Sequence, residues 1–321
     1  MQKLSLDDAL VDSLLAATES AAIAASALVG SGDKIAVDAA AVGAMRSAFD
    51  RIEVDATVVV GEGEKDRAPM LFAGERLGTG RGPALDIAVD PVDGTRLAAE
   101  NLPGSVAVLS VAASGAFFDP GPVFYLEKLI TTGAGRALGL ARPLGENLRE
   151  LALALGRPIG ELRVAVQTRP RNERYADEAR QAGALVLPFR DGDVAPAIRA
   201  AGAEGDIDLL IGIGGAPEGV LTAAAVRGLG GHMEARLAPQ HPDEIACALA
   251  AGASTERILD LDELVRGDGY LFLTAVTDGD SAPTGDTLAG VARGAGSART
   301  DSWVVDPHRG VLRVTRRHPL G

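Results

Sequence analysis

The chain has 321 residues, 47% of them hydrophobic, which is enough for one large or two ordinary globular domains. A formal net charge of −13 argues against nucleic acid and anionic membranes as partners, but not against a phosphorylated sugar held by a metal and basic side chains. A single cysteine, Cys247, excludes an intrachain disulfide, and with only four histidines no Cys/His zinc cluster is visible.

The first fifty residues predict two helices, over 5–30 and 37–51, joined by a turn at 32–34. No uninterrupted apolar run approaches about 18 residues and no signal peptide is evident, so we expect no membrane span and a cytoplasmic location. Asp38, in the first turn of the second helix, is either a favourable charge at a helix N-terminus or a metal ligand. Lys34, just before it, could meet a phosphate.

Two predicted strands in residues 58–95 both end in carboxylates. The strand at 58–60 is followed by Glu62, and the strand at 85–89 is followed by the sequence DPVDGT at residues 90–95. Ligand sites in α/β sheets form beyond the carboxyl ends of strands, so Glu62, Asp90 and Asp93 are expected around one point. Each acid alone is more simply a solvated turn residue, but crowded carboxylates need a cation or a proton. An all-oxygen site suits Mg²⁺ or Mn²⁺.

The DPVDGT turn adds features that suit a phosphate ester. Gly94 permits close backbone approach, and Thr95 can start a helix whose N–H groups attract phosphate. A metal, an anion site and a hydroxyl in one turn therefore suggest a phosphatase.

The remainder of the chain predicts alternating strands and helices. Strands are expected at 106–111 and 123–130, and a helix at 147–155 ends at a Gly/Pro break. We place there the boundary between an N-terminal metal-binding α/β domain, 1–156, and a C-terminal α/β sugar- and phosphate-binding domain, 157–321. Strands at 162–166, 184–187 and 207–211 alternate with helices at 172–183, 194–201 and 218–229, which is typical of a parallel βαβ sheet. Further strands are expected at 270–276, 302–305 and 311–315.

Three polar clusters follow strands of this second half, at 169–171, 191–193 and 212–219. Clusters on one sheet edge point to one ligand crevice. The glycine-rich run at 212–219 lacks the lysine of a nucleotide P-loop, so we interpret it as backbone donors for hydroxyls or phosphate.

Motifs over about residues 15–237, in order and in register, resemble the class II fructose-1,6-bisphosphatases. They are GDK at 32–34 with Asp38, GEGEKDRAPML at 61–71, DIAVDPVDGT at 86–95, YLEKL at 125–129, DGDVA at 191–195 and GIGGAPEG at 212–219. The DPxDGT turn alone is shared with the inositol monophosphatase-like, lithium-sensitive phosphatases and would give only that superfamily.

The resemblance implies a layered α-β-α-β-α sugar-phosphatase fold whose two α/β halves share an active-site cleft. It also implies Mg²⁺- or Mn²⁺-dependent hydrolysis of the 1-phosphate of fructose 1,6-bisphosphate, a gluconeogenic reaction.

The resemblance further implies roles for individual residues. The implied metal ligands are Asp38, Glu62, Asp90 and Asp93; the implied catalytic groups are Glu62, Asp90 and Thr95, the hydroxyl that orients the attacking water. The implied substrate contacts are Lys34, Gly94, Thr95, Tyr125, Arg169, Arg171, Asp191, Asp193, Gly215 and Glu218. Arg169 and Arg171, two apart on an extended segment, are predicted to point the same way and clamp the distal phosphate.

The sequence leaves two alternative functions open. Sedoheptulose 1,7-bisphosphate or another sugar phosphate could be the substrate, because sugar contacts come from loops. The family usually has Glu where Asp93 stands, so the metal geometry is expected to shift or a water to intervene. A non-catalytic sugar-phosphate-binding protein is less favoured, because the metal carboxylates and the threonine are kept. The Ala-rich first helix permits a homo-oligomer, a dimer or a tetramer.

Overall fold

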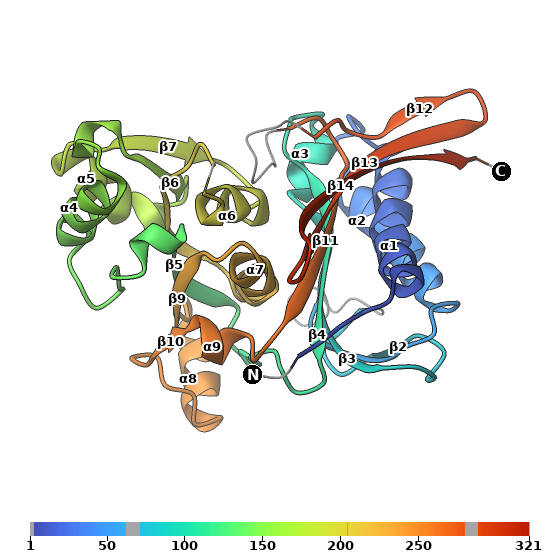
Figure 1. The fold of residues 1–321 in the computed structure, drawn as a ribbon, viewed down its shortest axis with the longest axis horizontal. Coiled ribbons are helices and arrows are strands. Elements are labelled where there is room, and N and C mark those ends of the chain that lie inside the picture. The colour runs from blue at the N-terminus through green and yellow to red at the C-terminus, as the bar shows by residue number, and fades with distance from the viewer. Residues whose placement is uncertain (1–2, 62–70, 204, 280–287, 321) are drawn as a thin grey trace.

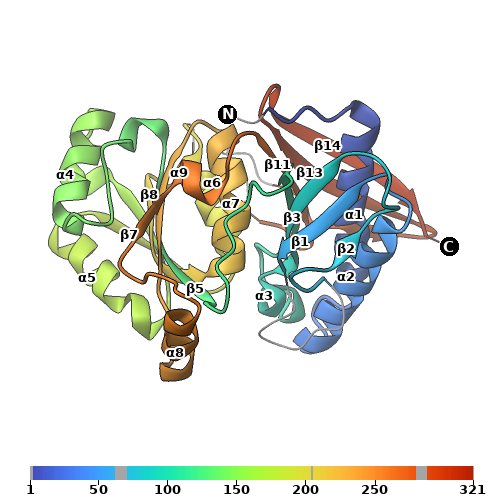
Figure 2. The ribbon, with the colours of Figure 1, turned by 90° about the horizontal axis from the view of Figure 1, so that it is seen from below.

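The computed structural model describes residues 3–61, 71–203, 205–279 and 288–320, and it has five alternating layers of helices and sheets (Figure 1). The outer helices α1 (Asp8–Ser26) and α2 (Lys34–Phe49) lie on one face of the first sheet. Helices α6 (Val194–Ala201) and α7 (Ala216–Gly228) lie between the two sheets, and α4 (Leu144–Leu155) and α5 (Glu173–Gln181) cover the far face of the second. The expected α-β-α-β-α arrangement is therefore confirmed, as the view from below also shows (Figure 2).

The first sheet combines the beginning and the end of the chain. Its strand order is β12-β13-β11-β4-β3-β1-β2, and β14 pairs with β13. Only β1 and β3 are parallel among its described pairs. The strands are β1 (Asp55–Val60), β2 (Arg76–Leu77), β3 (Ala84–Asp93), β4 (Val106–Ala113), β11 (Gly269–Ala275), β12 (Ala292–Gly294), β13 (Ser297–Asp306) and β14 (Gly310–Pro319).

The second sheet comes from the middle of the chain, in the order β10-β9-β5-β8-β6-β7. Its strands are β5 (Tyr125–Thr131), β6 (Arg163–Gln167), β7 (Leu185–Phe189), β8 (Leu209–Gly215), β9 (His232–Leu237) and β10 (Ile258–Asp260). Strand β6 is parallel to β7 and β8, as the βαβ pattern predicted, whereas β5 is antiparallel to β8 and β9. The sheets do not divide the chain at residue 156, since β5 lies in the second sheet and β11–β14 return to the first.

Small side chains let the layers approach closely. Helix α7 buries a row of alanines, including Ala223, Ala224 and Ala225, against both sheets. A Cβ on Gly269 of β11 would lie 2.8 Å from the Ala224 Cβ, so glycine is required where this helix crosses the strand. A core poor in aromatic residues is thus packed through short helix-to-sheet distances.

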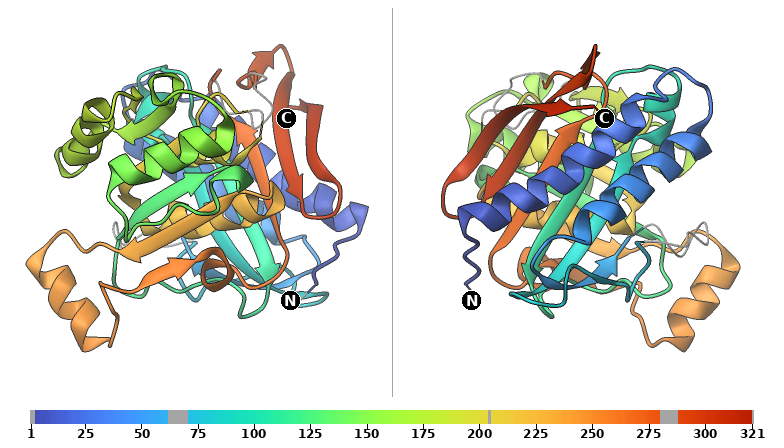
Figure 3. Two further views of the ribbon diagram at one scale, coloured as in Figure 1. Left: turned by 60° about the vertical axis from the view of Figure 1, so that its left-hand side comes forward. Right: turned by 90° about the vertical axis from the view of Figure 1, so that its right-hand side faces the viewer.

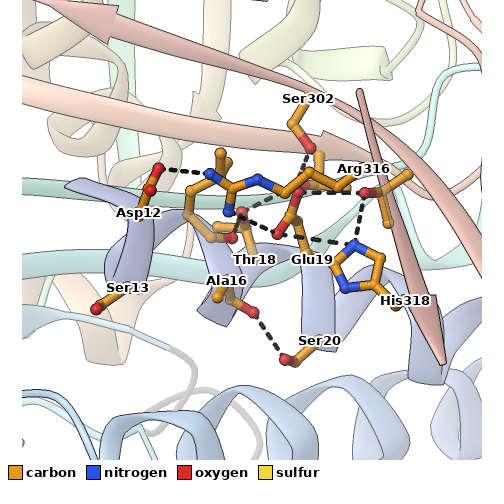
Figure 4. A network of polar contacts seen from close by, with 12 residues as sticks. Asp12, Ser13, Ala16, Thr18, Glu19, Ser20, Ser302, Arg316 and His318 are labelled. Atoms are coloured by element: carbon orange, nitrogen blue, oxygen red, sulfur yellow. Dashed lines mark hydrogen bonds and ion pairs between the residues drawn. The ribbon is translucent and has the colours of Figure 1, made fainter. Parts of the chain in front are cut away.

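Helix α1 is long and apolar enough by composition to cross a membrane, yet half of that segment is buried in this fold. It lies beside α2 along the first sheet, as the right-hand view of Figure 3 shows. Its Glu19 is 1% exposed and accepts a hydrogen bond from Thr300 (3.2 Å) and one from Arg316 (3.3 Å), with the His318 Nε2 at 3.8 Å (Figure 4). These polar contacts identify α1 as a helix of the folded core.

The remaining helices are short. They are α3 (Thr95–Ala99), α8 (Pro242–Ala250) and α9 (Leu261–Leu264). Helix α8 projects from the second sheet (Figures 2 and 3).

Candidate active site

A cavity of about 970 Å³ opens between the two halves of the fold. Every candidate site residue that the structure describes lines it: Lys34, Asp38, Asp90, Asp93, Gly94, Thr95, Tyr125, Arg169, Arg171, Asp191, Asp193, Gly215 and Glu218. Glu62 lies outside the described residues. Residues far apart in the sequence are therefore gathered on one surface, contributed by both sheets.

The DPVDGT segment continues strand β3 and then turns into α3. The strand was expected to end at residue 89 but runs to Asp93, with an irregular register against β4 between Asp90 and Asp93. Such a bulge tolerates the proline, which has no N–H for the ladder. Gly94 then adopts φ 78°, and Thr95 begins α3 as predicted, with its hydroxyl donating to the Val92 carbonyl at 3.0 Å.

Three carboxylates converge beside this turn. Asp90, Asp93 and Glu218 each offer an oxygen, and these atoms all lie within 4.8 Å of one another. Asp90 and Asp93 are buried, and the Asp90 Oδ1 accepts the Val92 N–H at 3.0 Å. Asp38 lines the same cavity but is not a member of this close group.

The chemistry of this donor set fits a hard divalent cation. Burial raises the pKa of Asp93 well above its usual range, and the charges of Asp193 and Glu218 add to that effect. The Val194 N–H, 3.0 Å from the Asp93 Oδ2, and the Lys128 charge oppose it. Crowded carboxylate oxygens in a buried position are stabilised by a cation such as Mg²⁺ or Mn²⁺.

The two arginines do not lie on an extended segment as predicted, because Pro170–Asn172 forms a 3-10 turn between strand and helix. Arg169 forms an ion pair with Asp191. Arg171 donates to the Ile213 carbonyl at 3.0 Å and stacks over the Tyr125 ring at 4.6 Å, and burial lowers its pKa. Both guanidinium groups line the cavity, but each is already held by groups of the protein.

Comparison with known proteins matches the sequence of this chain to one family. The family model for bacterial fructose-1,6-bisphosphatase, glpX-encoded, matches residues 8–318. Fructose-1,6-bisphosphatase 1 class 2 of Escherichia coli K12 and fructose-1,6-bisphosphatase class 2 of Shigella flexneri are each 41% identical over 315 residues. These alignments cover 94% of this chain and 91% of the relative. The chain belongs to the bacterial class II fructose-1,6-bisphosphatase family. It is therefore a phosphoric monoester hydrolase of a metal-dependent family that acts on small sugar phosphates.

The sequence did not fully predict the roles of two residues in this fructose-1,6-bisphosphatase site. Glu218 was expected only as a substrate contact, yet it lies in the acid group with Asp90 and Asp93. Its position just after strand β8 was the available signal, since the same rule had singled out Glu62. Lys128 was noted only as part of the YLEKL motif and was given no role, although a lysine within an apolar strand marks a buried charge that needs a partner.

Proposed function

We propose that this protein hydrolyses fructose 1,6-bisphosphate to fructose 6-phosphate and phosphate, a gluconeogenic step, with Mg²⁺ or Mn²⁺. The observation that carries the proposal is the convergence of Asp90, Asp93 and Glu218 beside Thr95. The cavity joins this acid group to basic side chains, as a bisphosphorylated sugar requires. Identity of 41% to class 2 fructose-1,6-bisphosphatases supports the same substrate.

The proposed metal ligands are Asp38, Glu62, Asp90 and Asp93, and Glu218 adjoins Asp90 and Asp93. When bound, the cations lower the pKa of the attacking water and neutralise charge that develops on the phosphoryl oxygens. The Thr95 hydroxyl donates a hydrogen bond to the Val92 carbonyl. Its oxygen can therefore accept a hydrogen bond from that water and orient it.

The remaining cavity residues are proposed to hold the substrate. Lys34, Arg169 and Arg171 supply positive charge for the distal phosphate, and the Gly94 and Gly215 backbones allow close approach. Tyr125, Asp191, Asp193 and Glu218 complete the wall that faces the sugar.

The test is phosphate release from fructose 1,6-bisphosphate with and without Mn²⁺, beside sedoheptulose 1,7-bisphosphate and a panel of other phosphorylated sugars. Asp90→Asn is expected to reduce kcat by about 10³-fold or more, because the cation then loses a charged ligand. Asp262→Asn, at an exposed position paired with Arg227, is the control and is expected to retain activity. An Asp90→Asn variant that hydrolyses as fast as the parent contradicts the metal assignment.

We further propose that the enzyme is cytoplasmic and forms a homodimer or homotetramer. The match to a family of bacterial fructose-1,6-bisphosphatases, enzymes of sugar metabolism, supports the location. Light scattering of the purified protein measures the oligomeric state, and a monomer at cellular concentration would contradict it.

A further inference from the structure

Lys128 is a lysine buried in the middle of the fold, beside the proposed metal site. It lies on β5 with 2% of its surface exposed, on the side of the second sheet that faces α6 and α7. Its Nζ forms an ion pair with Asp193, which is 6% exposed, and donates to the Gly215 carbonyl at 3.1 Å. A lysine so deeply buried is held by its partners and does not reach a substrate.

The glycines around residues 212–219 make room for this lysine. A Cβ on Gly214 would overlap the Asp193 carboxylate and lie 2.9 Å from the Lys128 Nζ, and a Cβ on Gly219 would lie 3.0 Å from the Lys128 Cδ. The sequence pattern alone suggests that the glycine run provides backbone donors for a ligand. At Gly214 and Gly219 the structure gives another reason for glycine, which is space for the buried lysine.

The ion pair connects two segments that position acids of the site. Asp193 directly precedes Val194, whose N–H donates to the Asp93 Oδ2 at 3.0 Å. Gly215 directly precedes α7, whose first turn carries Glu218. One ammonium group therefore contacts both the 191–194 loop and the β8–α7 junction. Its charge also reaches Asp93, where it opposes the charges of Asp193 and Glu218.

We infer that Lys128 is a positioning residue of the metal site, and that Asp193 is its counter-ion. Asp193 keeps the ammonium directed away from Asp93 and Glu218, so that those carboxylates stay available to a cation. Without Asp193, the buried ammonium would have these acids as its remaining anionic neighbours and would compete with the metal for them. This inference rests on the proposed metal site and adds the counter-ion role to the place that Asp193 has in the wall of the cavity.

The test measures Mn²⁺ binding to the metal-free protein by calorimetry, for the parent, Asp193→Asn and the double variant Lys128→Met/Asp193→Asn. Asp193→Asn is expected to weaken Mn²⁺ binding by about 10- to 100-fold, as loss of an outer-shell partner does. The double variant, which removes the unpaired ammonium as well, is expected to recover most of the affinity.

Asp191→Asn is the matched control, because Asp191 lines the same cavity two residues away but pairs with Arg169. It is expected to raise KM and leave Mn²⁺ affinity unchanged. The inference is overturned if Asp193→Asn binds Mn²⁺ like the parent, or if the double variant stays as impaired as Asp193→Asn.

Folding is followed by fluorescence of Trp303, the single tryptophan, which is buried in the core that includes α7. If Asp193→Asn unfolds, a folded double variant with parental Mn²⁺ affinity still supports the counter-ion role, and an unfolded one counts against it. Failure of the proposed function would appear differently, as a parent protein that neither binds Mn²⁺ nor releases phosphate.

Discussion

At the scale of single residues, the site depends on the absence of a side chain at Gly214. Its backbone passes directly over the Lys128–Asp193 pair, and both partners are nearly inaccessible to water. A methyl group there would separate the two charges without changing either of them. A substitution at this position therefore changes the geometry of the ion pair while both charges stay in place.

Gly214→Ala is expected to lower the free energy of unfolding by about 1–3 kcal/mol, because the added methyl overpacks a closed space. Gly43→Ala is the control: Gly43 lies within α2, and a Cβ added there would meet no atom of the described residues within 4 Å. Since alanine favours the helix, that control is expected to gain about 0.5–1 kcal/mol. Urea unfolding measures both, and equal effects of the two substitutions would contradict the packing argument.

Short-range patterns were predictable at this scale, and long-range pairs were not. Asp90, Asp93 and Thr95 lie within one hexapeptide, so glycine and threonine chemistry sufficed to predict the turn at Gly94 and the helix start at Thr95, although β3 continues to Asp93. Lys128 and Asp193 are 65 residues apart, and only the folded sheet brings them together. Their pairing depends on tertiary structure that no local pattern encodes.

At the scale of elements, α1 makes buried polar contacts with β11, β13 and β14. Thr18, Thr274 and Ser302 form a chain of hydroxyl contacts, each 2.9 Å long. Glu19 is buried next to this chain beneath Arg316 (Figure 4). Burial raises the pKa of Glu19, while the charges of Arg316 and His318 oppose the rise. A carboxyl with a raised pKa stabilises the fold when protonated and less so as pH rises through that pKa.

Arg316→Met is expected to lower the free energy of unfolding at pH 7 by about 2 kcal/mol, because it leaves Glu19 ionised and uncompensated. This figure is below the range for fully buried pairs, since Arg316 is 28% exposed and also contacts Asp12. The loss should shrink as the pH falls and Glu19 takes up a proton. In a Glu19→Gln background, Arg316→Met should change the free energy of unfolding little at any pH. Thermal denaturation across pH 4–8 tests this, and a loss independent of both pH and Glu19 would contradict it.

Proline and glycine residues limited how well the ends of strands could be predicted. Helices expected at 37–51 and 218–229 correspond to α2 and α7 within a few residues. The sequence pattern ended two strands too early, because β3 continues through Pro91 and β8 continues through the glycines to Gly215. Both residue types disfavour strands, and neighbouring strands override that preference here. The bulge beside Pro91 and the space for Lys128 explain why these residues occur there.

At the scale of the whole molecule, the first sheet is completed only by the last strands of the chain. Strand β11 lies between β4 and β13, and α1 packs against both β11 and β13. The second sheet, by contrast, is built from one continuous stretch between residues 125 and 260. The domain division at residue 156 was expected from the Gly/Pro break there and stays a prediction, whereas the first sheet takes strands from both sides of that point.

A chain that ends at residue 278 is expected not to fold, because it lacks β12–β14 and exposes the apolar surfaces of β11 and α1. A chain that ends at residue 319 keeps all of β14 and serves as the control. Circular dichroism and size-exclusion chromatography distinguish the two. A cooperative thermal transition of the shorter chain near the parental temperature would contradict the expectation.

The placement of β11–β14 also bears on how the protein is made. During synthesis the ribosome releases α1, α2 and β1–β4 first, yet these segments must wait for strands that emerge last. The middle of the chain can complete its own sheet in the meantime. The nascent polypeptide therefore carries an unfinished N-terminal layer through most of translation, which is the interval in which we expect it to depend most on chaperones.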